Sequence, residues 1–559
     1  MTSIAPKWTR RVSTTTAAEP TTGLGPAGWI GAAGAVVISA SSWWVGSVPH
    51  AWQTHPPAQL GWFAIGSIQP RIAFYVGLIL LTAAWLSLGR NVLSSPRAEG
   101  ARRMRRIALV WATPMMGAIP LASRDLWAYA TQGRLIQRGF DPYSYAPIDM
   151  PGVFSQNVSP GWVHSPAPYG PFWLAVNHAV AATYGEHVLI AVFLLRIPVL
   201  AGLLVLLWAV PRLAERAGIP ADRALWLTAA NPFTIELVLG AGHNDLLMAG
   251  LMTAGAALAL RPGPAVAVTI PAAAVMALAA GVKSPGFIGL AFVVPLVLSR
   301  NDDVTRRSLR TVVTVTAAAL VSGLVTFAVV SVATGFGLGW VHQVGASAPL
   351  VNWLSVPTDT AIFADIITGH VDGATHLDDP MRHWRTAGLI LSAVLIAAIW
   401  IGAVLAATGR KRLPRPTASR PTANRPEPNR PAASRPATSQ AGTAVTMLGT
   451  AMLTLTLLGP AVQLWYLLWA LPFLTRAGDH RRAIFALATI ETAMVFTVDP
   501  HGLSFTMKPV VTAIIAVSAV VVWLTLRHSF VSASPSADHD PDRARAGVHA
   551  DGRSHFQGD

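Results

Sequence analysis

Long apolar segments recur along most of the chain and are separated by short polar or charged stretches. A helix needs about 20 apolar residues to cross the hydrocarbon core of a bilayer, and most of these segments approach that length. The pattern predicts an all-α polytopic membrane protein with roughly 12–14 transmembrane helices. The predicted spans lie at roughly 28–48, 71–89, 107–122, 187–210, 224–241, 246–260, 265–282, 286–299, 311–333, 386–408, 442–459, 461–475, 483–498 and 510–526.

The composition agrees with lipid as the solvent. Of the 559 residues, 52% are hydrophobic and only 12% are charged, whereas soluble domains usually carry about 25% charged residues. The chain has no cysteine, which rules out disulfides, thiolate metal sites and a cysteine nucleophile. The first apolar segment is long enough to remain as an anchor rather than to be removed as a secretory signal.

The positively charged residues predict the orientation of the chain. Most of the 41 Lys and Arg fall in the two termini and in alternate loops, at 90–106, 211–223, 300–310, 409–441 and 476–482. Cytoplasmic loops retain an excess of Lys and Arg, so these segments and both termini are predicted to lie inside. The net charge of +15 is therefore interpreted as a signal of membrane topology and not of nucleic-acid binding.

The same pattern divides the chain into five regions. They are a cytoplasmic arm at 1–27, a transmembrane core at 28–408, a linker at 409–441, C-terminal transmembrane helices at 442–527 and a tail at 528–559. Arg-Pro pairs recur every five residues in the linker, and such proline density favours an extended, solvated chain. We expect a disordered linker held near anionic lipid by its charge, followed at the end of the chain by a disordered tail.

Two large outer loops, 123–186 and 334–385, collect most of the unusual side chains of the core. Six of the seven tyrosines fall on outer segments, together with several tryptophans. Aromatic belts form at both membrane interfaces, so a one-sided enrichment suggests stacking on a sugar ring as well. The apolar run 170–185 is expected to form an interfacial or re-entrant helix, because a crossing there would invert every later loop.

A carboxylate follows the third predicted span directly, in the stretch from Ser123 to Tyr129. At the boundary between membrane and water, Asp125 could act as a general base on a hydroxyl nucleophile while a lipid-borne leaving group stays in the bilayer. It could equally cap the helix that follows, because Asp is a favoured N-cap residue. The residues alone do not favour either interpretation over the other.

Charges within an apolar span are costly and are usually paired or functional, and two such residues stand out. They are Arg196 in the fourth span and Glu236 in the fifth. The simpler interpretation is that they pair with each other and hold two helices together. The alternative is a functional role, in which Arg196 binds a phosphate.

Other candidates lie at the outer ends of spans. Lys283 could hold a lipid phosphate or could simply extend to the interface. His243 and Asp245 could ligate a metal, but two residues at this spacing are a weak signal. Asp141 lies in a proline-aromatic turn and is expected to form that turn.

Five stretches, taken in order, resemble one family. The ordered set resembles the actinobacterial polyprenol-phosphate-mannose-dependent α-(1→6)-mannopyranosyltransferases, which are GT-C membrane glycosyltransferases that build the mannan core of lipomannan. The similarity runs from about residue 107 to 510 and excludes the Arg-Pro linker. The stretches are SRDLWAYATQGRLIQRGFDPYSYAP, SPAPYGPFW, NPFTIELVLGAGHND, GVKSP and LWYLLW.

The resemblance implies a GT-C-like bundle with interfacial helices on a large outer loop, and it assigns roles to residues. GT-C enzymes carry an essential acidic residue in the first large outer loop, and Asp125 matches it, which favours the catalytic interpretation. Arg124, Lys283 and Arg196 would hold the donor phosphate. The substrate-binding candidates are Tyr129, Asp141, Tyr143, Tyr169, His243, Asn244, Asp245, Trp465 and Tyr466. One departure is Gln463, where related sequences often carry a His-Pro or similar pair.

The resemblance also implies the reaction and its place in the cell. It implies a hexosyltransferase that moves mannose, with inversion, from polyprenyl-phosphate-mannose to a growing α-1,6-mannan or lipoglycan. The enzyme would be a multi-pass protein of the plasma membrane with its active site on the extracytoplasmic face. Its partners would be the lipid-linked donor, the mannan acceptor and the bilayer, with no nucleic acid. No cofactor is expected and no metal ligand set is evident, although dependence on a divalent metal is left open.

Two alternative functions are kept. Another GT-C activity, on arabinose or glucose, would depend on a pocket shape that a sequence does not reveal. A transporter of lipid-linked sugars is the alternative from a different class, but transporters tend to show internal repeats and charges at the midplane. This chain shows no evident repeat, and its unusual residues lie at the outer boundary.

Overall fold

The computed structural model describes residues 23–94, 100–300, 308–343, 355–368, 378–409, 440–475, 481–502 and 508–531. Every secondary-structure element in these ranges is helical, which confirms the predicted all-α fold.

The α-helices are α1 (Gly25–Val45), α2 (Ala51–Thr54), α3 (Ile68–Ser94), α4 (Gly100–Met115), α5 (Asp125–Gln137), α6 (Pro171–Tyr184), α7 (Val188–Ala217), α8 (Ala221–Thr228), α9 (Asp245–Ala259), α10 (Ala265–Val282), α11 (Gly286–Leu298), α12 (Leu309–Thr334), α13 (Trp340–Gln343), α14 (Val356–Thr368), α15 (Asp378–Ala407), α16 (Gln440–Leu458), α17 (Leu471–Leu474), α18 (Arg481–Thr497) and α19 (Lys508–Val531). Shorter 3₁₀ or π turns are η1 (Ala58–Leu60), η2 (Pro147–Asp149), η3 (Ser155–Asn157), η4 (Phe233–Gly240) and η5 (Leu464–Trp469).

Eight helices of the described ranges are long and apolar enough to cross a membrane, by length and composition. Two shorter apolar helices, α9 and α11, lie among them. The protein is therefore a polytopic membrane protein, as the apolar pattern predicts. The eight segments are Gly25–Val45, Ile68–Ser94, Val188–Ala217, Ala265–Val282, Leu309–Thr334, Met381–Ala407, Gln440–Leu458 and Val510–Arg527.

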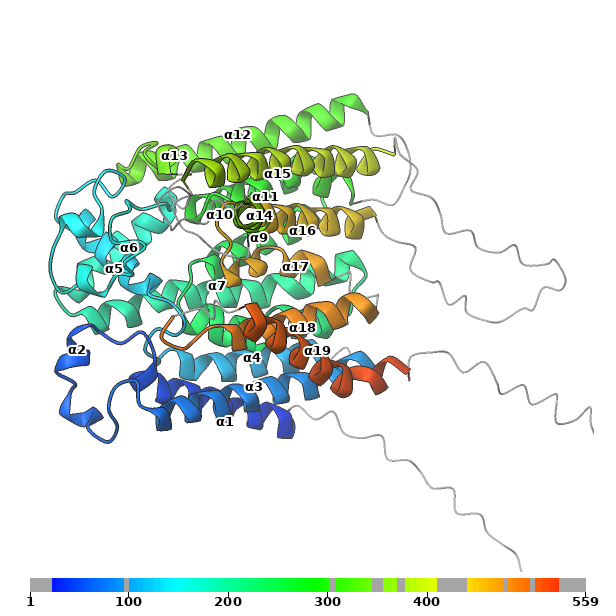
Figure 1. Ribbon diagram of the computed structural model, residues 1–559. Coiled ribbons are helices and arrows are strands. Elements are labelled where there is room, and N and C mark those ends of the chain that lie inside the picture. The colour runs from blue at the N-terminus through cyan, green and yellow to red at the C-terminus, as the bar shows by residue number, and fades with distance from the viewer. Residues whose placement is uncertain are drawn as a thin grey trace, which may run out of the picture.

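The long helices run alongside one another as a bundle, and α5, α6 and α13 gather at one end of it (Figure 1). The closest pairings are α1 with α3, α7 with α9, α10 with α9 and α12, and α15 with α16. The predicted interfacial segment 170–185 forms α6, which begins with a proline in its first turn and packs against α5, α7 and α10. Both short helices, α5 and α6, lie at the end of the bundle where the candidate site forms.

Two of the predicted spans are broken rather than continuous. In the segment 224–241, α8 ends before Pro232, which lacks a backbone N–H and disfavours helix at the residue before it. Asn231 stabilises the break, because its side chain donates to the Leu227 carbonyl at 2.6 Å and accepts from the Thr234 backbone N–H at 2.6 Å. The chain then continues as the wider turns of η4. Short turns of this kind often occur at functional sites.

The segment 461–475 is also broken, into η5 and the short α17. Pro460 precedes η5, and Pro472 lies in the first turn of α17, a position at which proline is favoured. This break leaves three aromatic rings, Trp465, Tyr466 and Trp469, on one compact turn. The two breaks bring η4 and η5 into contact.

Candidate active site

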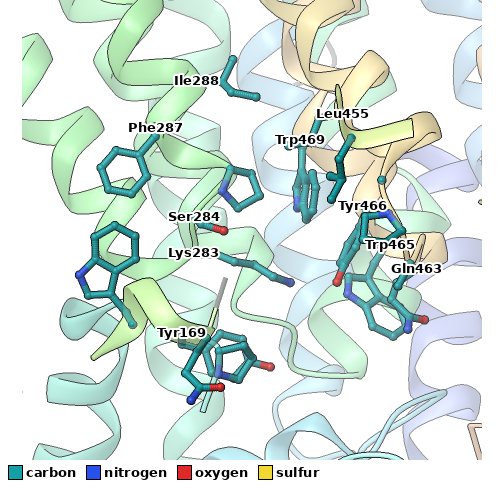
Figure 2. A pocket seen from close by; sticks show the side chains of 18 of the residues that line it. Tyr169, Lys283, Ser284, Phe287, Ile288, Leu455, Gln463, Trp465, Tyr466 and Trp469 are labelled. Carbon is teal, nitrogen blue, oxygen red and sulfur yellow. The ribbon is translucent and has the colours of Figure 1, made fainter. Parts of the chain in front are cut away.

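A cavity of about 520 Å³ opens at the end of the bundle that carries α5 and α6. It combines one carboxylate, one ammonium group and many aromatic rings. Figure 2 shows Lys283 among the rings of Tyr169, Tyr466 and Trp469. Its walls come from the start of α5, the loop before α6, the α10–α11 junction, α13, α15, the end of α16, and η5 with the segment that precedes it. The lining residues are Asp125, Trp162, Pro168, Tyr169, Lys283, Ser284, Pro285, Phe287, Ile288, Trp340, Gln343, Leu389, Leu455, Gly459, Pro460, Ala461, Gln463, Trp465, Tyr466 and Trp469.

Asp125 is the first residue of α5, and its carboxylate does not serve as the N-cap of that helix. Arg124 occupies the cap position and makes no side-chain cap bond, so the capping interpretation is wrong. Asp125 is 8% exposed, and one carboxylate oxygen is bound by His243 Nδ1 at 3.0 Å. Burial raises the pKa of this carboxyl, but the His243 hydrogen bond, reinforced by Lys283, outweighs burial and holds the pKa of Asp125 below its usual value.

His243 reaches Asp125 because the chain turns sharply after η4. Gly242 has φ of +80°, and any larger residue there would be strained and would clash with the side chain of Leu126. The imidazole is fully buried and stacks on the Trp465 ring with centroids 3.6 Å apart. An ionised carboxylate can only accept a hydrogen bond, so the proton of the pair lies on Nδ1. These contacts hold the Asp125 carboxylate in one orientation.

Lys283 provides the positive charge of the cavity. It follows the last residue of α10, and its Nζ lies 2.9 and 3.1 Å from the two carboxylate oxygens of Asp245. Trp469 donates to the same carboxylate at 2.6 Å. The ammonium also lies 4.5 Å from the Tyr466 ring centroid, a favourable cation–π distance. Burial lowers the pKa of Lys283, but the Asp245 charge outweighs that effect and raises it, so the side chain stays protonated.

Two tyrosines complete the surroundings of Asp125. The Tyr129 hydroxyl lies 3.5 Å from the Asp125 carboxylate, and its ring meets the Tyr169 ring edge to face at 5.2 Å. Burial, followed by the neighbouring Tyr169 and Asp125, raises the pKa of Tyr129 well above its usual value. The phenol is therefore neutral and donates toward the carboxylate. Tyr169, Trp465 and Tyr466 present their rings to the cavity (Figure 2).

Two candidate arginines do not line this cavity. Arg196 is completely buried and donates to the backbone carbonyls of Met116, Ala118 and Gly240 at 3.4, 2.7 and 2.9 Å. It therefore ties α7 to the end of α4 and to η4, and does not pair with Glu236. Arg124 donates to backbone carbonyls in the neighbouring loops. Both arrangements favour a structural role over phosphate binding.

Six further candidates also lie outside the lining. Tyr129, His243 and Asp245 contact lining residues through the hydrogen bonds given above. Asp141 accepts from the Tyr143 backbone N–H at 3.0 Å and from the Ser144 hydroxyl at 2.5 Å, so it forms its own turn. Tyr143 donates to the Tyr169 carbonyl at 3.0 Å and thereby supports the cavity wall from behind. Asn244 is fully buried between His243 and Asp245, and its amide has no protein partner among the described residues.

Several lining residues are not among the sequence candidates, and one of them is prominent. Trp469 binds Asp245 and stacks on Tyr466 with centroids 4.0 Å apart. The LWYLLW stretch contains it, but nothing in that pattern says which ring meets a carboxylate 224 positions away. Within the described part of the chain, no group of three or more His, Cys, Asp and Glu is placed to hold a metal. His243 and Asp245 turn to different partners.

The fold and site thus define a polytopic helical membrane protein with a cavity, lined by an aspartate and a lysine, at one end of its bundle. The family model for the α-(1→6)-mannopyranosyltransferase N-terminal domain matches residues 28–299, and that for the MptB C-terminal domain matches residues 436–528. The chain is 32% identical to α-(1→6)-mannopyranosyltransferase A of Mycobacterium tuberculosis over 484 residues, which cover 85% of this chain and 84% of the relative. It is 28% identical to α-(1→6)-mannopyranosyltransferase B of Corynebacterium glutamicum, over 85% of this chain and 77% of the relative.

The chain belongs to the α-(1→6)-mannopyranosyltransferase family, which confirms the resemblance carried by its ordered motifs. No solved structure matches it.

Proposed function

We propose that the protein transfers mannose from polyprenyl-phosphate-mannose to a growing α-1,6-mannan on the outer face of the plasma membrane. The observation that carries the proposal is the cavity itself, where the Asp125 carboxylate and the Lys283 ammonium face one aromatic-lined space. A sugar transfer needs a base for the incoming hydroxyl and a positive charge for the departing phosphate. The family relationship supports mannose as the sugar.

The proposed reaction is a single displacement. The 6-hydroxyl oxygen of the acceptor forms a bond to the anomeric carbon of the donor while the bond from that carbon to the phosphate oxygen breaks. Asp125 takes the hydroxyl proton, and polyprenyl phosphate leaves with the bonding electron pair. Attack from the face opposite the phosphate converts a β-linked donor into an α-linked product. Lys283 stabilises the negative charge that develops on the phosphate.

The surrounding side chains would hold the two sugars. The Trp465 and Tyr466 rings on η5 and the Tyr169 ring on the outer loop offer flat apolar faces to the cavity. The hydroxyl of Tyr129 and the imidazole of His243 both contact Oδ2 of Asp125 and so orient its carboxylate. The excess of Lys and Arg in the predicted cytoplasmic loops supports an extracytoplasmic site.

The test is a transfer assay with purified protein in liposomes. Radiolabelled polyprenyl-phosphate-mannose and a short, water-soluble α-1,6-mannoside would be supplied, and the linkage in the product would be checked with an α-1,6-specific mannosidase. We expect an extended mannoside that this mannosidase degrades. Transfer only from polyprenyl-phosphate-arabinose or -glucose would overturn the choice of mannose. Net movement of intact donor across the bilayer without any transfer would favour a transporter.

Replacing His243 by Phe is expected to lower kcat and to move the acid limb of the pH profile upward. Phe keeps a ring on Trp465 but loses the hydrogen bond to Asp125. Losing a hydrogen bond to a charged group is expected to lower the rate by about ten- to a hundredfold. Asp125 acts in its ionised form, so activity is lost as the pH falls through its pKa. Losing a contact that lowers this pKa makes that loss occur at higher pH.

The measurement is kcat/KM as a function of pH for the wild type and the His243→Phe variant. An unchanged acid limb together with a lower kcat would show that His243 does not act through the ionisation of Asp125.

A further inference from the structure

An apolar groove adjoins the candidate active site. The groove has a volume of about 560 Å³ and lies between α11, α15 and α16. Four residues, Phe287, Ile288, Leu389 and Leu455, line both this groove and the cavity. In Figure 2, Ile288 and Leu455 lie at the same end of the cavity, beyond Lys283. The two spaces therefore adjoin, and aliphatic and aromatic side chains form the boundary between them.

One face of α15 forms a wall of the groove over several turns. Its lining residues are Leu389, Ser392, Ala393, Ile396, Ala397 and Trp400. Their spacing of three or four residues places them on one side of the helix, and eleven residues extend about 16 Å along it. Only 11% of the span of α15 is buried within the protein. The small side chains in the middle of this face therefore leave a trough that opens toward lipid.

The groove has a defined inner end. The Trp400 indole donates from α15 to the Ala291 carbonyl on α11 at 2.9 Å, so its ring crosses from one helix to the other. The Lys283 ammonium lies near the opposite end, because Lys283 stands three residues before the start of α11. A ligand with an anionic head and an apolar chain would fit this arrangement, with its head at the lysine and its chain along α11.

A second groove beside α12, of about 750 Å³, is less directly connected to the cavity. It shares Phe287 and Trp340 with the cavity. The rings of Phe287, Phe327 and Trp340 pack against one another with centroids 5.3 to 5.4 Å apart, so they form a wall between the two spaces. The groove beside α15 shares four lining residues with the cavity and the groove beside α12 shares two, so the α15 groove is the closer neighbour of Lys283.

We propose that the groove between α11, α15 and α16 binds the first part of the polyprenyl chain of the donor, with the phosphate held at Lys283. This inference rests on the lipid-linked donor of the proposed function. Burial of each methylene group in such a groove favours binding. The groove thereby fixes the direction in which the donor enters, from the lipid beside α15, and leaves the outer part of the cavity for the water-soluble acceptor.

The test fills the groove and varies the length of the donor chain. Ala393→Trp would be assayed in the full-length protein with mannosyl phosphates carrying either a long polyprenyl chain or a single isoprene unit, and with a water-soluble mannoside acceptor. KM for the long donor is expected to rise about tenfold, the equivalent of losing roughly two buried methylene groups. KM for the short donor should stay nearly unchanged. The matched control, Ala328→Trp, places the same side chain in the α12 groove and should affect neither donor.

Two further measurements keep the test decisive. Ala397→Phe blocks the groove one turn further along α15. If one of the two α15 variants misfolds, the other can still be compared with the wild type. Binding of radiolabelled long-chain polyprenyl phosphate needs no turnover and should weaken in both α15 variants and not in the control. If the wild type transfers from neither donor but this binding behaves as expected, the proposed function is contradicted and the proposal that the groove binds the polyprenyl chain is supported.

Three outcomes would contradict the proposal that the groove binds the polyprenyl chain. They are equal effects of Ala393→Trp on long and short donors, a loss confined to Ala328→Trp, and binding of polyprenyl phosphate that is absent or the same in the wild type and the α15 variants.

Discussion

Replacing Asp125 by Asn is expected to abolish measurable transfer while the protein stays folded. The amide has nearly the same shape as the carboxylate, and its oxygen can still accept from His243 Nδ1. It cannot take the proton of the acceptor hydroxyl, and general-base help contributes about 10²–10⁴-fold to a rate. We therefore expect kcat to fall by at least about 10²-fold, with little change in KM for either substrate.

The measurement compares the transfer rates and the thermal unfolding of the variant and the wild type in the same detergent. A matched control is Asp149→Asn, since Asp149 lies on the same outer loop but only accepts from the Ala146 backbone N–H. The control should keep nearly full activity. An Asp125→Asn variant that unfolds at the wild-type temperature and retains more than a tenth of the rate would show that another group takes the proton.

The apolar pattern predicts the continuous helices well because lipid imposes one rule on them. A spanning helix must satisfy its backbone hydrogen bonds internally and must be apolar for most of its length. The predicted span 28–48 is accordingly found as α1, and the span 71–89 as α3, each with ends displaced by only a few residues. The pattern fails at the breaks beside Pro232 and Pro472, because hydropathy does not say which prolines break a helix. Pro198 and Pro211 lie within the continuous helix α7.

The sequence also marks several residues of the candidate site, although it does not reveal their partners. Asp125 and Lys283 are conspicuous because each charge follows closely on an apolar span at the predicted outer side, where charges are few. The contact of Asp125 with His243 joins positions 118 apart, and that of Lys283 with Asp245 joins positions 38 apart. Such long-range pairings depend on how the helices pack. For the same reason, the burial of Arg196 among backbone carbonyls could not be distinguished in advance from a phosphate site.

The broken spans explain why the site forms where it does. In η4 the chain turns back into the end of the bundle and delivers His243, and η5 delivers the Trp465 ring on which His243 stacks. Continuous helices through these two segments would carry both rings along a helix axis instead of gathering them at one point. The places where hydropathy fails as a predictor of helices are thus the places that build the cavity.

Replacing Lys283 by Met is expected to abolish transfer and also to destabilise the fold. Asp245 is fully buried, and without the ammonium its charge keeps only the Trp469 indole as a side-chain donor among its described contacts. Removing one partner of a buried ion pair typically costs about 3–5 kcal/mol, because the remaining charge is left uncompensated. A loss of activity in this single variant would therefore not distinguish a role in phosphate binding from a role in folding.

The double variant Asp245→Asn/Lys283→Met separates the two roles. Removing both charges leaves no ion of this pair buried alone, and the amide oxygen introduced at position 245 can still accept from Trp469, so the stability of the fold should largely return. Transfer should not return, because nothing in the cavity then neutralises the departing phosphate. Thermal unfolding and transfer rates of the two single variants and the double variant provide the measurement. A double variant that is stable and also active would show that Lys283 serves only to compensate Asp245.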